Sequence, residues 1–175
     1  KPGALNYASA GVGSPLHLAA ELFKKRAGIT MVHLAYKGGG PAAAAVLGGE
    51  AQVLFASVAS SIPQIKAGRL KALATTGTQR SKVAPELPTI AESGFPGFDV
   101  SSWYALLVPA GTAQSIANRI RGAAIKAVEL PDVQEAMSRQ GLDVETSTPQ
   151  ALAARIKAES AVWAGVIREA GIKAE

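Results

Sequence analysis

The stretch Ser9-Ala10-Gly11-Val12-Gly13-Ser14-Pro15-Leu16-His17-Leu18 predicts a strand that ends in a glycine-rich turn and leads directly into a helix. Gly11 and Gly13 allow the backbone to turn tightly. Ser14 suits the N-cap of the helix, and Pro15 suits its first position, where no N–H is needed. Such a turn leaves backbone N–H groups open at a helix N-terminus, where they attract anions. The stretch is typical either of an anion-binding turn or of a plain strand-to-helix connection.

The segments after this turn alternate between helix-like and strand-like patterns. We expect helices over 14–27, 41–47 and 57–66, and buried strands over 31–35, 51–55 and 70–75. Brief connections between strands and helices predict an α/β fold with a mainly parallel sheet flanked by helices.

The second part of the chain has a different pattern. Residues 76–97 contain three prolines and predict a loop, which leads into a long strand over 100–108. Further on we expect helices over 112–130, from 131 onward and over 148–170, with an edge strand at 142–145. We therefore divide the chain into a first part over 1–99 and a second part over 100–175.

Composition excludes several classes of function. The chain of 175 residues is 48% hydrophobic and 18% charged, which is typical of a globular protein, and no apolar run is long enough to cross a membrane. There is no cysteine, and His17 and His33 are isolated in the sequence, so we expect no metal site and no cofactor. The net charge of +5 comes from scattered basic residues without interleaved aromatic ones, which favours attraction of acidic solutes over nucleic-acid binding.

Catalysis is weighed at Ser14 and His17, which lie three apart on the expected helix. A serine nucleophile with a histidine base competes here with a structural cap and a structural histidine. No carboxylate has an obvious orienting role, and the Gly-x-Ser-x-Gly elbow of an α/β hydrolase is absent. We predict that the protein is not an enzyme and keep a small hydrolase as an alternative.

A second glycine loop, Tyr36-Lys37-Gly38-Gly39-Gly40-Pro41, also follows a strand and opens a helix, so it too should offer a flexible backbone and free N–H groups. Neither loop matches a P-loop or a dinucleotide fingerprint. Ligands of open parallel sheets bind at the carboxyl ends of strands, so both loops are expected to face one cleft, with Ala56 and Ser57 after the third strand. Tyr36 also suits a half-buried aromatic, Lys37 a solvated charge, and Ser57 a helix cap. The candidate ligand-binding residues are Ser9, Ala10, Gly11, Val12, Gly13, Ser14, Tyr36, Lys37, Gly38, Gly40, Pro41, Ala56 and Ser57.

Six motifs, in their order and spacing, resemble the tripartite tricarboxylate transporter substrate-binding proteins, also called the Bug family. The motifs are Asn6–Ser14 with His17-Leu18, Val32–Pro41, Ile65–Ala74, Pro88–Gly94, Ser101-Ser102-Trp103 and Leu107–Thr112. The resemblance implies a type 2 periplasmic-binding-protein fold of two lobes. Residues 1–99 would form the second, ligand-binding lobe, and residues 100–175 the hinge strand and C-terminal helices of an incomplete first lobe. It also implies a periplasmic protein that performs no chemistry and delivers a small carboxylate or dicarboxylate to membrane components of a transporter. Backbone amides, hydroxyls and waters would hold the carboxylates between the lobes, which here implies the loops 9–14 and 36–41.

The sequence departs from the family pattern at two points. Many relatives carry an acidic residue where this chain has Ala56, and relatives have an amino-terminal stretch before the position of Lys1 that supplies the first strands of the first lobe. On this basis we expect an incomplete first lobe and weak or absent binding of dicarboxylates by this chain. The helices over 112–130 and 148–170 are expected to pack on a second copy in a homo-oligomer, on each other, or back on the rest of the chain. No signal-peptide pattern is present at residues 1–3. The effector-sensing domain of a transcription regulator is a further alternative, although no helix-turn-helix segment is visible.

Overall fold

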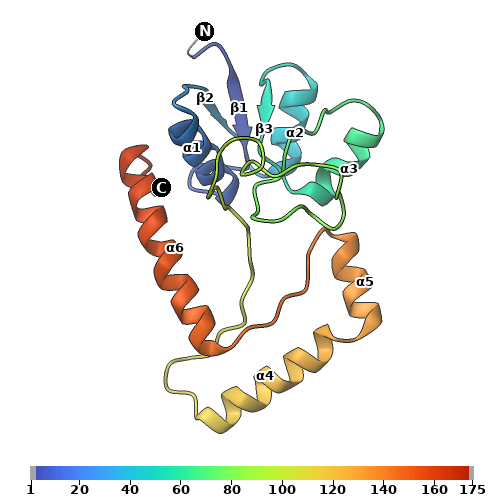
Figure 1. Ribbon diagram of the computed structural model, residues 1–175, viewed down its shortest axis with the longest axis vertical. Coiled ribbons are helices and arrows are strands. Elements are labelled where there is room, and N and C mark those ends of the chain that lie inside the picture. The colour runs from blue at the N-terminus through green and yellow to red at the C-terminus, as the bar shows by residue number, and fades with distance from the viewer. Residues whose placement is uncertain (1–2, 174–175) are drawn as a thin grey trace.

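A parallel sheet of three strands, in the order β2-β1-β3, lies at the centre of the computed structural model, which describes residues 3–173. The strands are β1 (Asn6–Ser9), β2 (Val32–Ala35) and β3 (Val53–Leu54). The helices α1 (Pro15–Ala27) and α2 (Gly39–Leu47) connect them, and α3 (Val58–Lys66) follows β3 (Figure 1). The expected parallel α/β arrangement is confirmed.

The central strand β1 forms the core because helices cover both of its faces. Tyr7 packs with Ala20 of α1, whereas the next residue, Ala8, packs with Ala42 of α2. Successive side chains of a strand point to opposite faces, so α1 and α2 lie on opposite sides of the sheet. Alanines at these contacts let the helices approach the sheet closely, which explains how a chain with 5% aromatic residues fills its core.

Three helix caps occur at the residues that the sequence predicts. The Ser14 hydroxyl accepts a hydrogen bond from the backbone N–H of His17, and Thr148 caps the last helix in the same way. Gly28 ends α1 in the left-handed conformation, with a φ of 64°. These caps were predicted from the sequence and are confirmed.

Two expected caps are corrected. Ser57 stands at the N-cap of α3, but its side chain makes no capping hydrogen bond. Instead, its carbonyl accepts from the hydroxyls of Ser60 and Ser61, one turn into the helix. The N-cap of the fourth helix is Ala113 rather than Thr112.

Three predicted strands are wrong within the described residues. The segment 70–75 forms only one bridge, between Thr75 and Thr89, because its neighbour is the loop at 88–90 and not the sheet. The segments 100–108 and 142–145 form no ladder with any described residue. Val100 is buried and its N–H donates to the Thr76 carbonyl, but Leu107 further along is 71% exposed. Strand propensity alone does not supply the partner that a ladder needs.

The C-terminal part consists of α4 (Gln114–Val128), α5 (Pro131–Arg139) and α6 (Pro149–Glu169). An extended segment leaves the sheet region and leads to α4 and α5, which contact each other and have no buried described residue (Figure 1). Helix α6 returns alongside α1, and Val166 near its end is 4% exposed in a cluster with Leu22 and Phe98. Of the packing arrangements expected for these helices, α6 therefore packs back on the part over 1–99.

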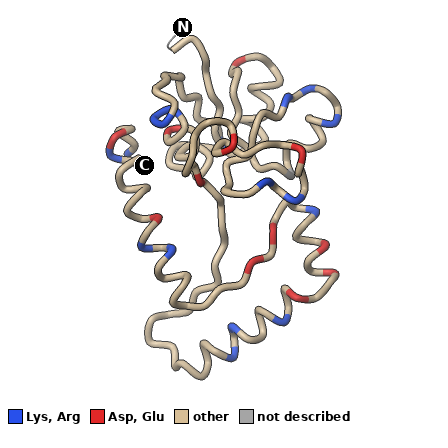
Figure 2. Tube along the Cα trace, in the orientation of Figure 1, with Lys and Arg blue, Asp and Glu red and all other residues tan. Residues whose placement is uncertain are grey.

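Charged residues of both signs occur on the helices and loops, whereas residues 3–20 and 100–118 carry none (Figure 2). Several lie in ion pairs, such as Lys24 with Glu21 and Arg155 with Glu159. In the part of the chain that the structure describes, no helix combines the length and the apolar character needed to span a membrane.

Candidate functional site

The loops that follow the three strands lie at one edge of the sheet. We call Ser9–Ser14 the first exit loop, Tyr36–Pro41 the second exit loop and Ala56-Ser57 the third exit. The strands are parallel, so their carboxyl ends meet at the same edge. The β1–β3 register pairs Ala8 with Leu54, and Ala56 follows two residues after Leu54. The sequence-based expectation that these loops share one edge agrees with this topology.

The first two exit loops are joined by backbone hydrogen bonds. The Tyr36 N–H donates to the Ser9 carbonyl at 3.1 Å, and the Gly38 N–H donates to the Ala10 carbonyl at 3.0 Å. A Cβ placed on Gly11 would lie 3.4 Å from the Tyr36 carbonyl oxygen, and Gly11 has a φ of 138°. A side chain at Gly11 would therefore strain the backbone and lie in close contact with the second exit loop.

Several amides that the sequence suggested would be open are already used. The N–H of Gly11 donates to the Ser9 hydroxyl at 3.2 Å, and that of Gly13 donates to Nδ1 of His17 at 3.0 Å. The N–H of Ser14 donates to the Gly11 carbonyl. The expected cluster of unpaired amides in the first turn is thus corrected: these three groups stabilise the loop itself.

Other amides at the same edge make no hydrogen bond within the described residues. They belong to Ala10, Val12, Lys37, Gly39 and Gly40. Gly39 and Gly40 open α2, where the helix dipole adds positive potential. Open backbone N–H donors can hold a carboxylate without a buried cation.

The remaining candidate residues have mixed surroundings. The Tyr36 ring packs partly buried beside Ala8 and Ala42, and its hydroxyl donates to Glu50 at 3.0 Å. Lys37 and Ser57 are exposed, whereas Ala56 is half-buried. Pro41 lies exposed in the first turn of α2, with no N–H to offer. Tyr36 matches the half-buried aromatic that the sequence allowed.

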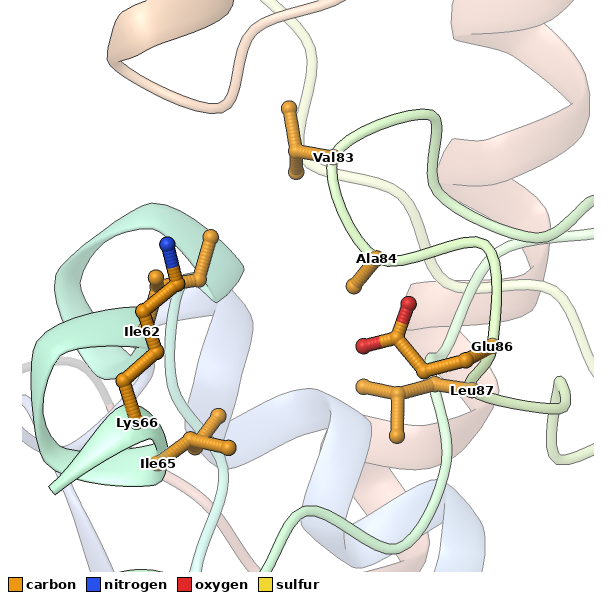
Figure 3. A pocket seen from close by; sticks show the side chains of 7 residues that line it. All are labelled: Ile62, Ile65, Lys66, Val83, Ala84, Glu86 and Leu87. Carbon is orange, nitrogen blue, oxygen red and sulfur yellow. The ribbon is translucent and has the colours of Figure 1, made fainter.

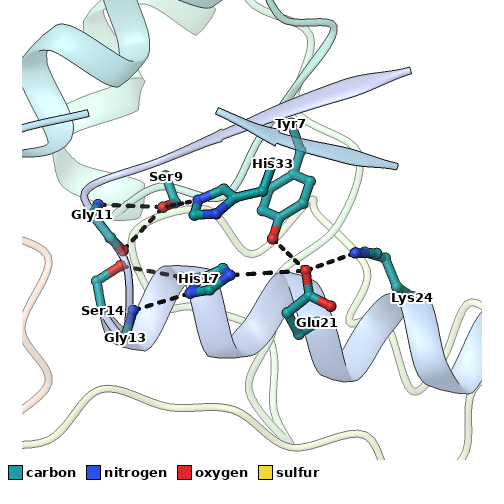
Figure 4. A network of polar contacts seen from close by, with 9 residues as sticks. All are labelled: Tyr7, Ser9, Gly11, Gly13, Ser14, His17, Glu21, Lys24 and His33. Carbon is teal, nitrogen blue, oxygen red and sulfur yellow. Dashed lines mark hydrogen bonds and ion pairs between the residues drawn. The ribbon is translucent and has the colours of Figure 1, made fainter. Parts of the chain in front are cut away.

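Beside the first exit loop, between the strands and α1, lies a stack of aromatic rings that sequence reasoning missed (Figure 4). The rings of His17 and His33 are parallel, with centroids 3.9 Å apart, and the ring of Tyr7 stacks on His33 at 4.8 Å. Nε2 of His33 lies 2.7 Å from the Ser9 hydroxyl. The two histidines, isolated in the sequence, are therefore in contact. The available signal was the strand register, which places His33 directly beside Tyr7.

Glu21 of α1 closes this stack on the side away from the loop. Its carboxylate accepts from the Tyr7 hydroxyl at 2.5 Å and from Lys24 Nζ at 2.7 Å, and it lies 3.8 Å from Nε2 of His17. Burial by itself raises the pKa of Glu21, but hydrogen bonds from Lys24 and Tyr7 outweigh it and hold that pKa below its usual range. Burial raises the pKa of Tyr7 far above its ordinary value, so the phenol stays protonated.

Both histidines are kept neutral by their surroundings. Burial, and after it the neighbouring His17, lower the pKa of His33 to about 4. Burial also lowers the pKa of His17, although the Glu21 carboxylate opposes this shift. Ser14 accepts from the backbone of His17 and not from its ring, so the two side chains do not form a nucleophile and base pair.

Stability is expected to fall as the pH drops from 6.5 toward 4. In this range the unfolded chain binds a proton on His33 that the folded chain rejects, so stability is complete above the unfolded pKa and is lost as the pH approaches the folded one. Urea unfolding at a series of pH values measures the slope. The His33→Gln variant should flatten the upper part of this range, where carboxylates titrate little. Equal slopes in both proteins would contradict the prediction.

Two hollows lie away from the exit loops. One, of about 100 Å³, separates α3 from the segment 83–87 and is lined by Ile62, Ile65, Lys66, Val83, Ala84, Glu86 and Leu87 (Figure 3). The other, of about 320 Å³, lies between the end of α1 and the end of α6. Neither is lined by a residue of the exit loops.

The model of one protein family matches almost the whole chain. Its description is "Tripartite tricarboxylate transporter family receptor", and it matches residues 1–172. The chain belongs to this family. The resemblance inferred from the sequence motifs is confirmed, as is the fold class. The family consists of receptors for transport systems.

Individual relatives agree with this assignment. The protein BugT of Bordetella pertussis is 36% identical over 99% of this chain and 53% of its own length. A solved R. palustris protein with adipate has a TM-score of 0.83 at 30% identity, covering 98% of this chain and 57% of that protein. MatC from Rhodopseudomonas palustris with bound malate has a TM-score of 0.75 at 29% identity, covering 94% and 57%. The chain spans about half the length of the first curated relatives that it matches.

Proposed function

We propose that this chain is the part of a periplasmic solute-binding receptor that holds an acid group of a small dicarboxylate and presents it to the membrane components of a transporter. The observation that carries the proposal is the set of open amides on two exit loops that are hydrogen-bonded to each other. Amide donors in fixed positions bind a carboxylate through charge-assisted hydrogen bonds. The role is binding and release, with no chemical step.

Charge at the edge also favours an acidic ligand. The exposed Lys37 stands in the second exit loop, and the third exit carries Ala56 in place of a carboxylate. No negative side chain of these three loops therefore repels an acid group. Two structural neighbours contain dicarboxylates, adipate in one and malate in the other, which supports this ligand class.

Two lobes form part of the same proposal. Residues 1–99 supply the exit loops, and residues 100–175 supply the connection and helices of the other lobe. A single edge leaves one side of the ligand in water, whereas closure of two lobes excludes it. We therefore expect this chain to bind malate or adipate only in the millimolar range.

Titration of the isotope-labelled chain with malate and with adipate, followed by amide NMR shifts, tests the proposal. The Gly39→Pro variant removes one open N–H at the first position of α2, where proline is tolerated, and Gly38 with a ψ of 170° accommodates a following proline. We expect binding weakened about tenfold, because a hydrogen bond to a charged group is lost. Gly39→Ala keeps the N–H and serves as the matched control.

The shifts in the unmodified chain should be confined to the exit loops. Absence of any shift there at ligand concentrations well above the millimolar range would contradict the binding role. Equal affinities of the proline and alanine variants would show that the N-terminus of α2 does not hold the acid group.

A further inference from the structure

Two histidines from different elements contact the first exit loop from below. His17 comes from the first turn of α1 and is 4% exposed, whereas His33 comes from the middle of β2 (Figure 4). His17 accepts from the Gly13 N–H, and His33 contacts the Ser9 hydroxyl, which accepts from the Gly11 N–H. The amide of Val12 lies between these two fixed neighbours.

We propose that His17 and His33 are positioning residues, which hold the first exit loop so that the amides of Ala10 and Val12 stay open toward a ligand. That the open amides face a ligand rests on the proposed function, whereas the effect of the histidines on the loop conformation does not. The two histidines act on different amides, so their effects can be measured separately.

The contact with Gly13 fixes the chemical state of His17. A backbone N–H can only donate, so Nδ1 of His17 must carry a free electron pair. The proton of the neutral ring then sits on Nε2, which faces Glu21 at 3.8 Å. A protonated His17 has a donor at Nδ1 and cannot accept from Gly13. The bond therefore exists only while the ring is neutral.

The contact with Ser9 behaves differently. The Ser9 hydroxyl accepts from the Gly11 N–H and lies 3.2 Å from the Gly11 carbonyl, to which it donates when Nε2 of His33 carries a proton. Either neutral form of His33 and also its charged form can bond to this hydroxyl. Of the two histidine contacts with the loop, only the hydrogen bond between Gly13 and His17 is broken when the ring is protonated.

The groups around the two rings keep His17 neutral at ordinary pH. On α1 these are Glu21 and Lys24, on β1 it is Tyr7, and the two histidines face each other. Rings stacked at 3.9 Å resist carrying two positive charges, and burial disfavours even one. Nδ1 of His17 thus remains an acceptor for the Gly13 N–H over the pH range in which an exposed histidine begins to take up a proton.

Amide hydrogen exchange of the full chain, followed residue by residue by NMR, tests the proposal. In His17→Phe the stacked ring stays but the acceptor is lost, and we expect protection of the Gly13 amide to fall about fivefold, as for one lost hydrogen bond. His17→Asn places an amide oxygen near the position of Nδ1 and should restore the protection. His33→Phe should reduce protection at Gly11 and leave Gly13 unchanged.

A pH series adds a second readout that a purely structural role would not change. With the intrinsic exchange rate removed, Gly13 protection should fall with decreasing pH in the unmodified chain and stay level in His17→Asn. The pH series on the unmodified chain and His17→Asn tests the proposal even if His17→Phe fails to fold. Equal loss of protection throughout β1 and α1 in both phenylalanine variants, or full protection of Gly13 in His17→Phe, would overturn the proposal.

Malate titration of the same variants separates the two proposals. Loss of Gly13 protection together with weaker shifts at Ala10 and Val12 supports both. Loss of Gly13 protection in a chain that never responds to malate supports the positioning role and contradicts the binding role.

Discussion

Replacing Val166 with aspartate should release the end of α6 from α1 and destabilise the folded chain by about 3 kcal/mol or more. Val166 is 4% exposed and packs in a cluster with Leu22 and Phe98. A carboxylate there loses its water and finds no partner within that apolar cluster. The two tryptophans of the chain report on this contact, because Trp163 packs against the cluster and Trp103 donates to Glu159 of α6 at 2.8 Å.

The measurement combines urea unfolding with tryptophan fluorescence, whose emission should move to longer wavelength when α6 leaves α1. Val162→Asp is the matched control, since Val162 lies one turn earlier in α6 and is 53% exposed. It should change stability by about 0.5 kcal/mol at most. Similar losses in the two variants would mean that α6 does not dock through Val166.

Phe98→Ala should destabilise the chain by about 3–5 kcal/mol, the usual cost of truncating a fully buried phenylalanine. Phe98 is 1% exposed, and its ring meets Phe23 edge-on, with centroids 6.4 Å apart. It lies where the segment after the proline-rich loop crosses the cluster between α1 and α6. Removing the ring leaves a cavity that borders both helices. The loss of stability therefore exceeds the free energy of exposing the buried ring to water, because the cavity adds its own cost.

Thermal or urea unfolding of Phe98→Ala measures this loss. Tyr104→Ala truncates an aromatic residue six positions later that is 85% exposed, and its stability should stay within about 0.5 kcal/mol of the unmodified chain. A loss below about 1 kcal/mol for Phe98→Ala would contradict the cluster as the centre of stability.

The geometry of the exit loops explains why glycine stands at two of their positions in this chain. Gly11 and Gly38 both have positive φ, and their loops touch. Some of the amides tie the loops to each other and to the histidines beneath, which leaves the others open at a defined place. Fixed donors lose little entropy on binding, so a preorganised edge holds an acid group better than a flexible one.

Local signals allowed much of the fold to be predicted from the sequence. Ser14, Pro15 and Gly28 mark the two ends of α1, and the alternation of short strands and helices indicated parallel pairing, which the register of β1 with β2 shows. Once the strands are parallel, their exits must share one edge, so the grouping of the first two exit loops could be foreseen. Caps and periodicity are properties of residues within one or two turns of each other, and this is why the sequence reveals them.

Only the tertiary structure decided which groups at that edge are used and which segments pair. His17 takes the Gly13 amide, and His33 reaches Ser9 from a strand 24 residues away. The segment 100–108 has the composition of a strand but no strand partner among the described residues, and α6 docks on α1 near Val166. The physical reason is that a hydrogen-bond partner or a packed face belongs to a pair of residues. Partners distant in sequence are set by how the whole chain closes on itself, and no local pattern encodes them.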